Sequence, residues 1–265
     1  MLTKRIASAL VLIPVVAWSV YSGSTVLLVL VMLAALLAEH EYIALSRTAG
    51  YQPCAILAYV SVALLILGQQ WPYLPLVELS IGIGALLALV VEVFHRNRSG
   101  SFESWGATVA GMAYIGLPLL LALRLRSMDD GLAWMAIAFL GTWACDTAAY
   151  AVGRAIGHRR FFPAISPKKT WEGAIAGLLL GAPVVALMAF YGLSLSFPVG
   201  LIFGVLLVAA ATFGDLAESV IKRQAGVKDS GNLIPGHGGM LDRVDSLLFV
   251  FPVTYGFAVV TTLLF

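Results

Sequence analysis

Long apolar stretches follow one another along the chain, each close to the length of a membrane-spanning helix. An α-helix needs roughly 20 predominantly apolar residues to cross the hydrocarbon core of a bilayer. The predicted spans are Ile6–Tyr21, Thr25–Leu45, Cys54–Gln70, Leu76–Phe94, Trp105–Leu123, Leu132–Val152, Gly173–Tyr191, Pro198–Val220 and Leu247–Phe265. The sequence therefore predicts an all-α, polytopic integral membrane protein with about nine transmembrane helices.

The composition supports a membrane protein and excludes some partners. Hydrophobic residues make up 60% of the 265 residues and charged residues only 11%, whereas a soluble domain carries about 25% charged residues. The net charge of +2 is too small to indicate a nucleic-acid partner, and the chain has no basic run with interleaved aromatic residues. The N-terminal stretch resembles a secretory signal, but its apolar run continues past any neat small-x-small cleavage site and more spans follow, so we expect a first span that stays attached.

The positive charges predict the orientation of the spans. If the N-terminus is cytoplasmic, all but two of the 16 lysines and arginines fall on the cytoplasmic side, the exceptions being Arg124 and Arg126. Such a bias follows the positive-inside rule. The sequence therefore predicts a cytoplasmic N-terminus and a C-terminus on the opposite side.

Polar residues that suit chemistry are concentrated in the second part of the chain. Residues 1–100 are predicted to form about four N-terminal transmembrane helices with few motifs. Residues 101–265 are predicted to form a C-terminal catalytic region, with two cytoplasmic motif loops at 153–172 and 222–245.

Acidic residues occur within two predicted spans. Asp146 lies in the sixth span, and Asp215 and Glu218 lie near the cytoplasmic end of the eighth. An ionised group at mid-bilayer costs about 2.5–3.5 kcal/mol even on the mildest scale, so such residues usually face a polar cavity and serve a function. An interhelical polar clamp is the alternative for Asp146 and Asp215.

The 222–245 loop combines carboxylates with cations. Asp242 and Asp245 are three residues apart and share a helix face if the ninth helix begins there. Hard oxygen ligands of this kind hold Mg²⁺, and nearby cations neutralise phosphate oxygens. The same segment contains Lys222, Arg223, Lys228 and His237. This pattern predicts a magnesium–phosphate site.

The 153–172 loop offers a second group of phosphate-binding side chains. In "SPKKTWEG", Ser166, Lys168, Lys169 and Thr170 precede a predicted helix start, where backbone N–H groups favour anions. The Walker A pattern is absent. A basic loop that only orients the protein and contacts lipid headgroups is the alternative.

Other polar residues leave their roles open. His237 lies among Gly236, Gly238 and Gly239, which suits either a flexible turn or a backbone nest around phosphate. We interpret five glutamates as interfacial and two cysteines as small buried apolar residues. These are Glu39, Glu41, Glu78, Glu92, Glu103, Cys54 and Cys145.

The segment "SVIKRQAGVKDSGNLIPGHGGMLDRVD", Ser219 to Asp245, resembles the signature of phosphatidate cytidylyltransferases, also called CDP-diacylglycerol synthases. "SPKKTWEG" and the aspartate of "CDTAAY" also look like elements of that family. The matching positions are Ser219, Lys222, Arg223, Lys228, Asp229, Gly231, Ile234, Pro235, His237, Gly238, Gly239, Asp242, Arg243 and Asp245.

The resemblance implies an enzyme that transfers CMP from CTP to phosphatidate and releases pyrophosphate. It also implies a divalent cation, one Mg²⁺ ion or two cations, with Asp215, Asp242 and Asp245 as metal ligands. We expect an integral protein of the bacterial inner membrane whose active site faces the cytoplasm. The oligomeric state stays open, and a homodimer is one candidate. The catalytic residues would be Asp215, Asp242, Asp245, Lys222 and Arg223, and the substrate-binding residues Ser166, Lys169, Thr170, Asp146, His237, Gly238, Gly239, Arg243 and Lys228.

Two alternative functions stay open at this point. An ion-coupled membrane transporter would use Asp146 and Asp215 as a relay, although it would not require the polar signature. A CTP-dependent polyprenol kinase would share the nucleotide and a lipid but not the transferred group.

Overall fold

The computed structural model describes residues 2–94, 100–234 and 236–264, without the side chains of residues 2–7 and 24. Pro235 of the signature, and Arg96 and Arg98 of the charge pattern, lie outside these residues. The chain forms two compact units. The first unit comprises Met1–Arg124 and Ile221–Val244, and the second comprises Leu125–Val220 and Asp245–Phe265.

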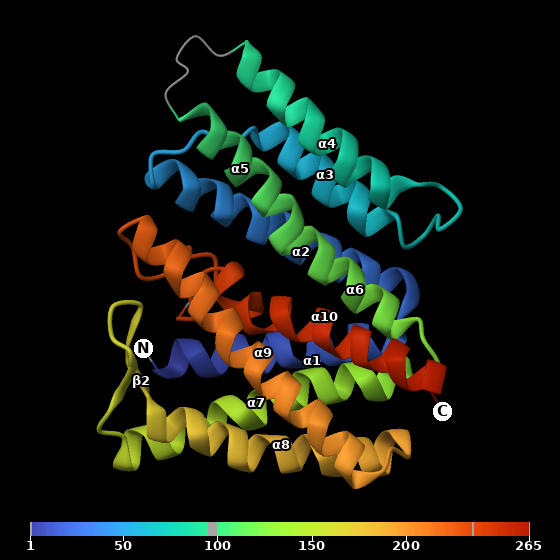
Figure 1. The fold of residues 1–265 in the computed structure, drawn as a ribbon, viewed down its shortest axis with the longest axis vertical. Coiled ribbons are helices and arrows are strands. Elements are labelled where there is room, and N and C mark those ends of the chain that lie inside the picture. The colour runs from blue at the N-terminus through green and yellow to red at the C-terminus, as the bar shows by residue number, and fades with distance from the viewer. Residues whose placement is uncertain (1, 95–99, 235, 265) are drawn as a thin grey trace. The chain divides into compact units, whose positions relative to one another are not determined.

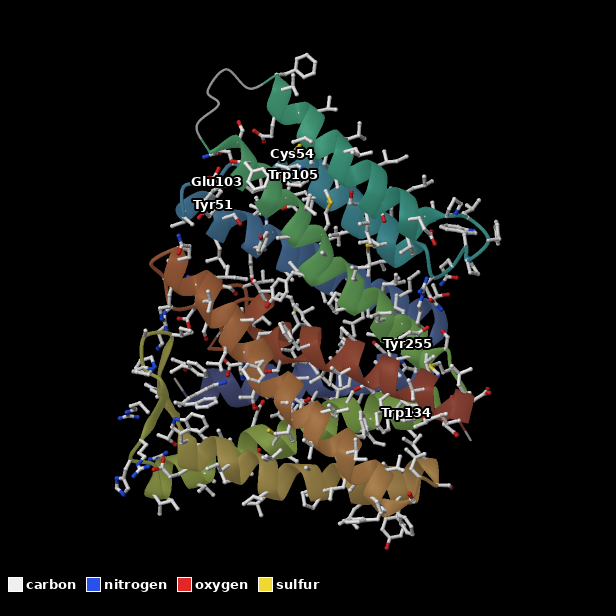
Figure 2. All side chains as sticks on the ribbon, in the orientation of Figure 1. Tyr51, Cys54, Glu103, Trp105, Trp134 and Tyr255 are labelled. Atoms are coloured by element: carbon white, nitrogen blue, oxygen red, sulfur yellow. The ribbon has the colours of Figure 1, made fainter. Side chains whose placement is uncertain are left out.

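The first unit is built from the N-terminal helices (Figure 1). Neighbouring helices pack in chain order, α2 on α3, α3 on α4 and α4 on α5. Trp105 Nε1–H donates to the carbonyl of Ala85 (2.9 Å), and the N–H of Cys54 donates to Thr108 Oγ1 (2.9 Å; Figure 2). The elements are α1 (Leu2–Ser22), α2 (Ser24–Thr48), α3 (Ala55–Leu67), α4 (Leu76–Val93), α5 (Ser101–Gly111), the π-helical turn η1 (Met112–Gly116) and α6 (Leu117–Arg126).

The second unit contains α7 (Gly131–Ile156) and α8 (Trp171–Leu193), which run side by side and are joined at one end by a β-hairpin (Figure 1). Strands β1 (Arg160–Phe162) and β2 (Ser166–Thr170) of this hairpin are antiparallel. α9 (Phe197–Gln224) and α10 (Leu241–Leu264) complete the unit, except for their polar ends, which belong to the first unit.

Small residues set the close packing of α7, α8 and α9. A Cβ at Gly181 would lie 3.2 Å from Cα of Cys145 on α7, and a Cβ at Gly204 would lie 2.8 Å from Cα of Ala182 on α8. Helices in membranes associate through such small residues because lipid supplies no hydrophobic drive for helix pairing. Trp134 of α7 packs edge-on against Phe203 of α9, with ring centroids 5.5 Å apart (Figure 2).

The observed helices confirm an all-α polytopic membrane protein. Seven helices of the described chain are long and apolar enough to cross a membrane, and shorter apolar helices occupy the first and third predicted spans. The total of nine spans and their orientation stay predictions. Large apolar side chains such as Leu179 and Leu206 are exposed, as lipid contact requires. Cys145 is buried as expected, whereas Cys54 is only half-buried.

Candidate active site

The close approach of α9 and α10 brings Asp215 and Asp245 toward each other in the second unit. Gly214 precedes Asp215, and a Cβ at this glycine would lie 2.7 Å from the backbone oxygen of Asp245. Only a residue without a side chain fits at such a distance. The glycine therefore allows the two acidic segments to pack backbone to backbone.

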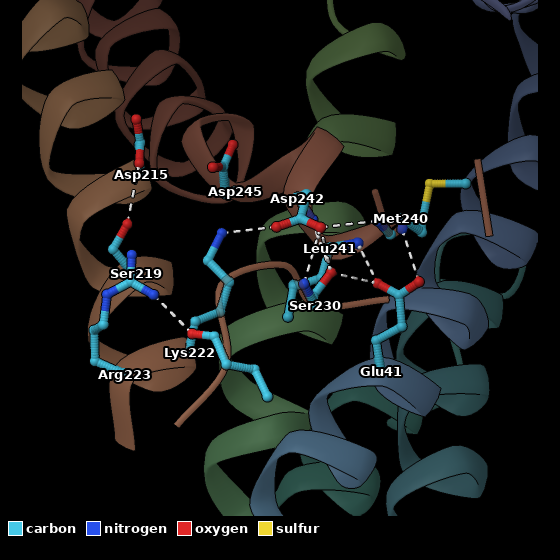
Figure 3. A network of polar contacts seen from close by, with 12 residues as sticks. Glu41, Asp215, Ser219, Lys222, Arg223, Ser230, Met240, Leu241, Asp242 and Asp245 are labelled. Carbon is cyan, nitrogen blue, oxygen red and sulfur yellow. Dashed lines mark hydrogen bonds and ion pairs between the residues drawn. The ribbon is translucent and has the colours of Figure 1, made fainter. Parts of the chain in front are cut away.

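Lys169 of β2 forms an ion pair with Asp215. Its Nζ lies 2.8 Å from Asp215 Oδ2 and also contacts the carbonyl oxygen of Thr212 at 3.5 Å. The second carboxylate oxygen, Oδ1, accepts a hydrogen bond from Ser219 Oγ at 3.3 Å (Figure 3). The first predicted motif loop thus contacts a predicted intramembrane acid, since the lysine of "SPKKTWEG" reaches Asp215 of α9.

Two further carboxylates belong to this group. Asp146 of α7 interacts electrostatically with Asp215, Lys169 and Asp245. Asp245 Oδ1 accepts the N–H of Ser246 at 2.6 Å in the first turns of α10. We call Asp146, Lys169, Asp215 and Asp245 the acidic cluster. It contains three carboxyl groups and one ammonium group, and that ammonium group contacts Asp215.

In the first unit, Asp242 is the centre of a separate network. Oδ1 accepts a hydrogen bond from Lys222 Nζ at 2.7 Å. Oδ2 accepts bonds from the N–H and the hydroxyl of Ser230, both at 2.9 Å, and from the N–H of Gly239 at 2.8 Å (Figure 3). Both oxygens of Asp242 are therefore engaged by protein donors, and the carboxylate holds the loop to the start of α10.

Glu41 of α2 takes part in the same network, although sequence reasoning assigned it to the membrane interface. Its carboxylate accepts the N–H groups of Met240 and Leu241, and it shares the single hydroxyl hydrogen of Ser230 with Asp242 (Figure 3). No local pattern around residue 41 indicates a partner near residue 240, so the sequence carried no signal for this contact.

The glycine-rich loop is an ordered turn in its described part. Ile234 and Gly238 form an isolated β-bridge, with the N–H of Ile234 donating to the carbonyl of Gly238 at 2.9 Å. Gly238 has a φ of 81°, which favours glycine. His237 Nδ1 lies 2.7 Å from Ser8 Oγ, so this imidazole ties the loop to α1.

The remaining predicted site residues either are exposed or have a structural role in the described part of the chain. Thr170 is buried, and its hydroxyl accepts the N–H of Gly173, which caps α8. Ser166 lies in β2, in register with Phe162. Arg223, Lys228 and Arg243 are exposed. The structure thus brings Asp146, Lys169, Asp215 and Asp245 together in the second unit, and Lys222 with Asp242 in the first.

The acidic cluster has the donor chemistry that a hard divalent cation requires. Its side chains offer carboxylate oxygens and neither sulfur nor imidazole, the set that suits Mg²⁺ or Ca²⁺. Among the described residues, no three His, Cys, Asp or Glu side chains already form a metal-binding group. Lys169 instead neutralises Asp215 directly. The residues fit a cation, but the roles of the individual carboxylates stay predictions.

Comparison with known proteins agrees with this chemistry. Residues 3–261 match the model of the "Cytidylyltransferase family". The phosphatidate cytidylyltransferase of Staphylococcus aureus strain COL is 34% identical over 235 residues, which cover 87% of this chain and 89% of that protein.

Two further relatives also cover most of this chain. The phosphatidate cytidylyltransferase of Staphylococcus haemolyticus strain JCSC1435 is 35% identical over 234 residues, covering 87% of this chain and 89% of the relative. Phosphatidate cytidylyltransferase 5, chloroplastic, of Arabidopsis thaliana is 36% identical over 272 residues, covering 90% of this chain and 67% of the relative. The match over almost the whole length shows that this chain belongs to the cytidylyltransferase family.

Proposed function

We propose that the protein is a phosphatidate cytidylyltransferase that transfers CMP from CTP to phosphatidate, giving CDP-diacylglycerol and pyrophosphate. The observation that carries this proposal is the ion pair of Lys169 with Asp215, because it joins the lysine of "SPKKTWEG" to an acidic residue of an apolar helix and so forms a charged site in a membrane protein. Membership of the family and the names of the relatives support the same reaction.

The reaction requires little acid–base chemistry from the protein. A phosphate oxygen of the lipid attacks the α-phosphorus of CTP, the bond from that phosphorus to the bridging oxygen breaks, and pyrophosphate leaves. Phosphate is already anionic at neutral pH, so no base has to remove a proton. Catalysis then depends on positioning and on neutralising the charge of the phosphates.

The charged residues suit these tasks. Lys169 is half-buried and fixed by β2, so it can exchange Asp215 for a substrate phosphate within the reach of its side chain. In the first unit, exposed side chains offer guanidinium and ammonium donors to polyphosphate, namely Arg223, Lys228 and Arg243. The contacts that we propose for substrate positioning are Ser166, Thr170 and the loop of His237, Gly238 and Gly239.

We propose Asp215, Asp242 and Asp245 as ligands of Mg²⁺, with Asp146 beside them and a second cation as a further expectation. When bound, the cation supplies charge neutralisation at the phosphate oxygens. Asp215 and Asp245 fit this role directly. Asp242 fits it only if Oδ1 releases Lys222, since Oδ2 already accepts three hydrogen bonds.

The location of the reaction follows from its substrates. Phosphatidate is held in a bilayer and CTP is soluble, so the two meet at a membrane surface. We propose the cytoplasmic face of the bacterial inner membrane, on the basis of the positive-inside bias. The enzyme is surrounded by membrane lipids. We further propose that it forms a homodimer.

Labelled CTP tests the function directly. Purified protein with phosphatidate, Mg²⁺ and CTP labelled at the α-phosphate should move the label into lipid, and CTP labelled at the γ-phosphate should not. Lipid label from the γ-position alone would identify a kinase and overturn the proposal. A protein that moves neither label, but carries ions across vesicle membranes, would be a transporter.

A further inference from the structure

Glu41 lies in α2, nearly 200 residues before the partners of its carboxylate. Oε1 accepts the N–H of Met240 at 2.9 Å, and Oε2 accepts the N–H of Leu241 at 2.8 Å and the hydroxyl of Ser230 at 2.8 Å. Only 6% of the residue is exposed. All of these residues belong to the first unit, so the contacts are internal to it.

The contacts place a negative charge at the N-terminus of α10. The first N–H groups of a helix have no partners within the helix, and a buried donor without a partner costs about 1–3 kcal/mol. A side chain just before the helix usually caps such groups. Met240 occupies that place and has no oxygen in its side chain, so the cap comes from a different helix.

Glu41 also reaches Asp242 through Ser230. The hydroxyl of Ser230 lies 2.8 Å from Glu41 and 2.9 Å from Asp242, and Asp242 is bound in turn by Lys222. A change at Glu41 would therefore alter the support of two proposed site residues that it does not touch.

The loop is shaped to admit this carboxylate. A Cβ at Gly231 would lie 2.8 Å from Glu41 Oε1, and a Cβ at Gly239 would overlap Glu41 Oε2 and Ser230 Oγ. Gly231 and Gly239 both belong to the signature. The structure explains why these positions are glycine without reference to phosphate binding. They leave space for Glu41.

We propose that Glu41 is a positioning residue for the transfer reaction, acting through Ser230, Met240 and Leu241. It fixes the loop between Lys228 and Leu241 and, with it, the side chains of Asp242 and Lys222. The effect on catalysis rests on the proposed function, whereas the contact itself does not.

The substitution Glu41→Gln tests this role with little change of shape. A glutamine has one acceptor oxygen and presents its NH₂ group where the second oxygen stood, so it cannot accept all three donors. Glu39→Gln is the matched control, because Glu39 is on the same helix and fully buried, and its oxygens accept no hydrogen bond among the described residues. Exposed Glu103 supplies a second control, Glu103→Gln.

Two measurements separate positioning from folding. Hydrogen exchange should be faster at the amides of Met240 and Leu241 in Glu41→Gln, and unchanged in the controls. The kcat/KM for CTP should fall by about a hundredfold, because displacement of a site by 1 Å costs about that much in rate. The KM for CTP, or the Mg²⁺ concentration for half-maximal rate, should rise with it. Glu41→Asp, which keeps both oxygens on a shorter side chain, should recover part of the loss.

Three results would overturn the proposal. Parent exchange rates in Glu41→Gln would show that the contact is absent. Faster exchange with a parent KM, kcat and Mg²⁺ response would show a contact without a positioning role. A lower rate that only follows the folded fraction, at parent KM and Mg²⁺ response, would make Glu41 a folding residue. Absence of CMP transfer in the parent protein would instead refute the proposed function and the positioning role together, while exchange would still test the contact.

Discussion

Lys222 and Asp242 form an ion pair of 2.7 Å in which only 10% and 7% of the two side chains are exposed. Asp242 is therefore held on one side by an ammonium group and on the other by Ser230 and Gly239. Removing one partner of a buried pair leaves the other charge without compensation.

Asp242→Asn should lower stability by about 3 kcal/mol, because it leaves the buried ammonium of Lys222 without its counter-charge. Asp245→Asn should have a much smaller effect, since the amide oxygen of asparagine can still accept the N–H of the adjacent Ser246. Thermal unfolding of both variants in the same detergent measures the difference. Equal Tm values would show that the Lys222–Asp242 pair contributes no stability.

Asp215→Asn and Asp245→Asn should reduce the rate of CMP transfer by about 10²–10³ and raise the Mg²⁺ concentration for half-maximal rate. The physical reason is the loss of a negative charge at the proposed metal site. A magnesium titration of each variant makes the measurement, with exposed Asp129→Asn as control. Turnover equal to that of the parent at limiting Mg²⁺ would remove both residues from the ligand set.

Lys169→Gln should raise the KM for CTP by tenfold or more while changing stability by less than about 1 kcal/mol. The ion pair with Asp215 is partly exposed, at 27% and 37%, so solvent screens its contribution to folding. Lys168→Gln is the matched control, because this neighbouring lysine is exposed. The assignment of Lys169 fails if the two variants have the same KM and kcat.

Gly204→Ala should destabilise the second unit by about 1–3 kcal/mol, because its Cβ would overlap the backbone oxygen of Ala182 and push α8 from α9. Gly256→Ala in α10 should be neutral or stabilising, since nothing lies within 4 Å of that Cβ. Thermal unfolding compares the two. A Tm for Gly204→Ala at or above that of Gly256→Ala would contradict the packing of α8 on α9.

Cysteine labelling tests the predicted orientation. Asn232 is exposed in the signature loop and suits a cysteine better than Gly231, where a Cβ would crowd Glu41. With Cys54 and Cys145 replaced by alanine, Asn232→Cys should react only from the cytoplasmic side, and Asp129→Cys only from the opposite side. Labelling of Asn232→Cys by an impermeant reagent added outside intact cells would reject the topology.

Hydrophobic length predicted most of the helices because burial in lipid depends on composition more than on specific partners. Trp105–Leu123, for example, lies within the continuous span Ser101–Arg126, although its π-helical turn has no recognised sequence signal. The β-hairpin at Arg160–Thr170 was expected as a loop, since two strands of three and five residues are too short for a clear alternation.

The sequence predicted the site residues that belong to a recognisable motif. It did not predict contacts between residues that are far apart in the sequence. Lys169 and Asp215 were both expected to act on phosphate or metal, but their pairing depends on how β2 meets α9. Glu41 resembled any glutamate near a helix end. Its role follows from the position of α10, which no residue near position 41 specifies.

The pairing of Lys169 with Asp215 has a consequence for the enzyme between turnovers. Carboxylates that are positioned to bind a cation repel one another when the cation is absent. Here the ammonium group of Lys169 serves as the counter-ion of Asp215. The cation and Lys169 should therefore compete for Asp215, and a fall in Mg²⁺ concentration should favour the ion pair and slow the enzyme.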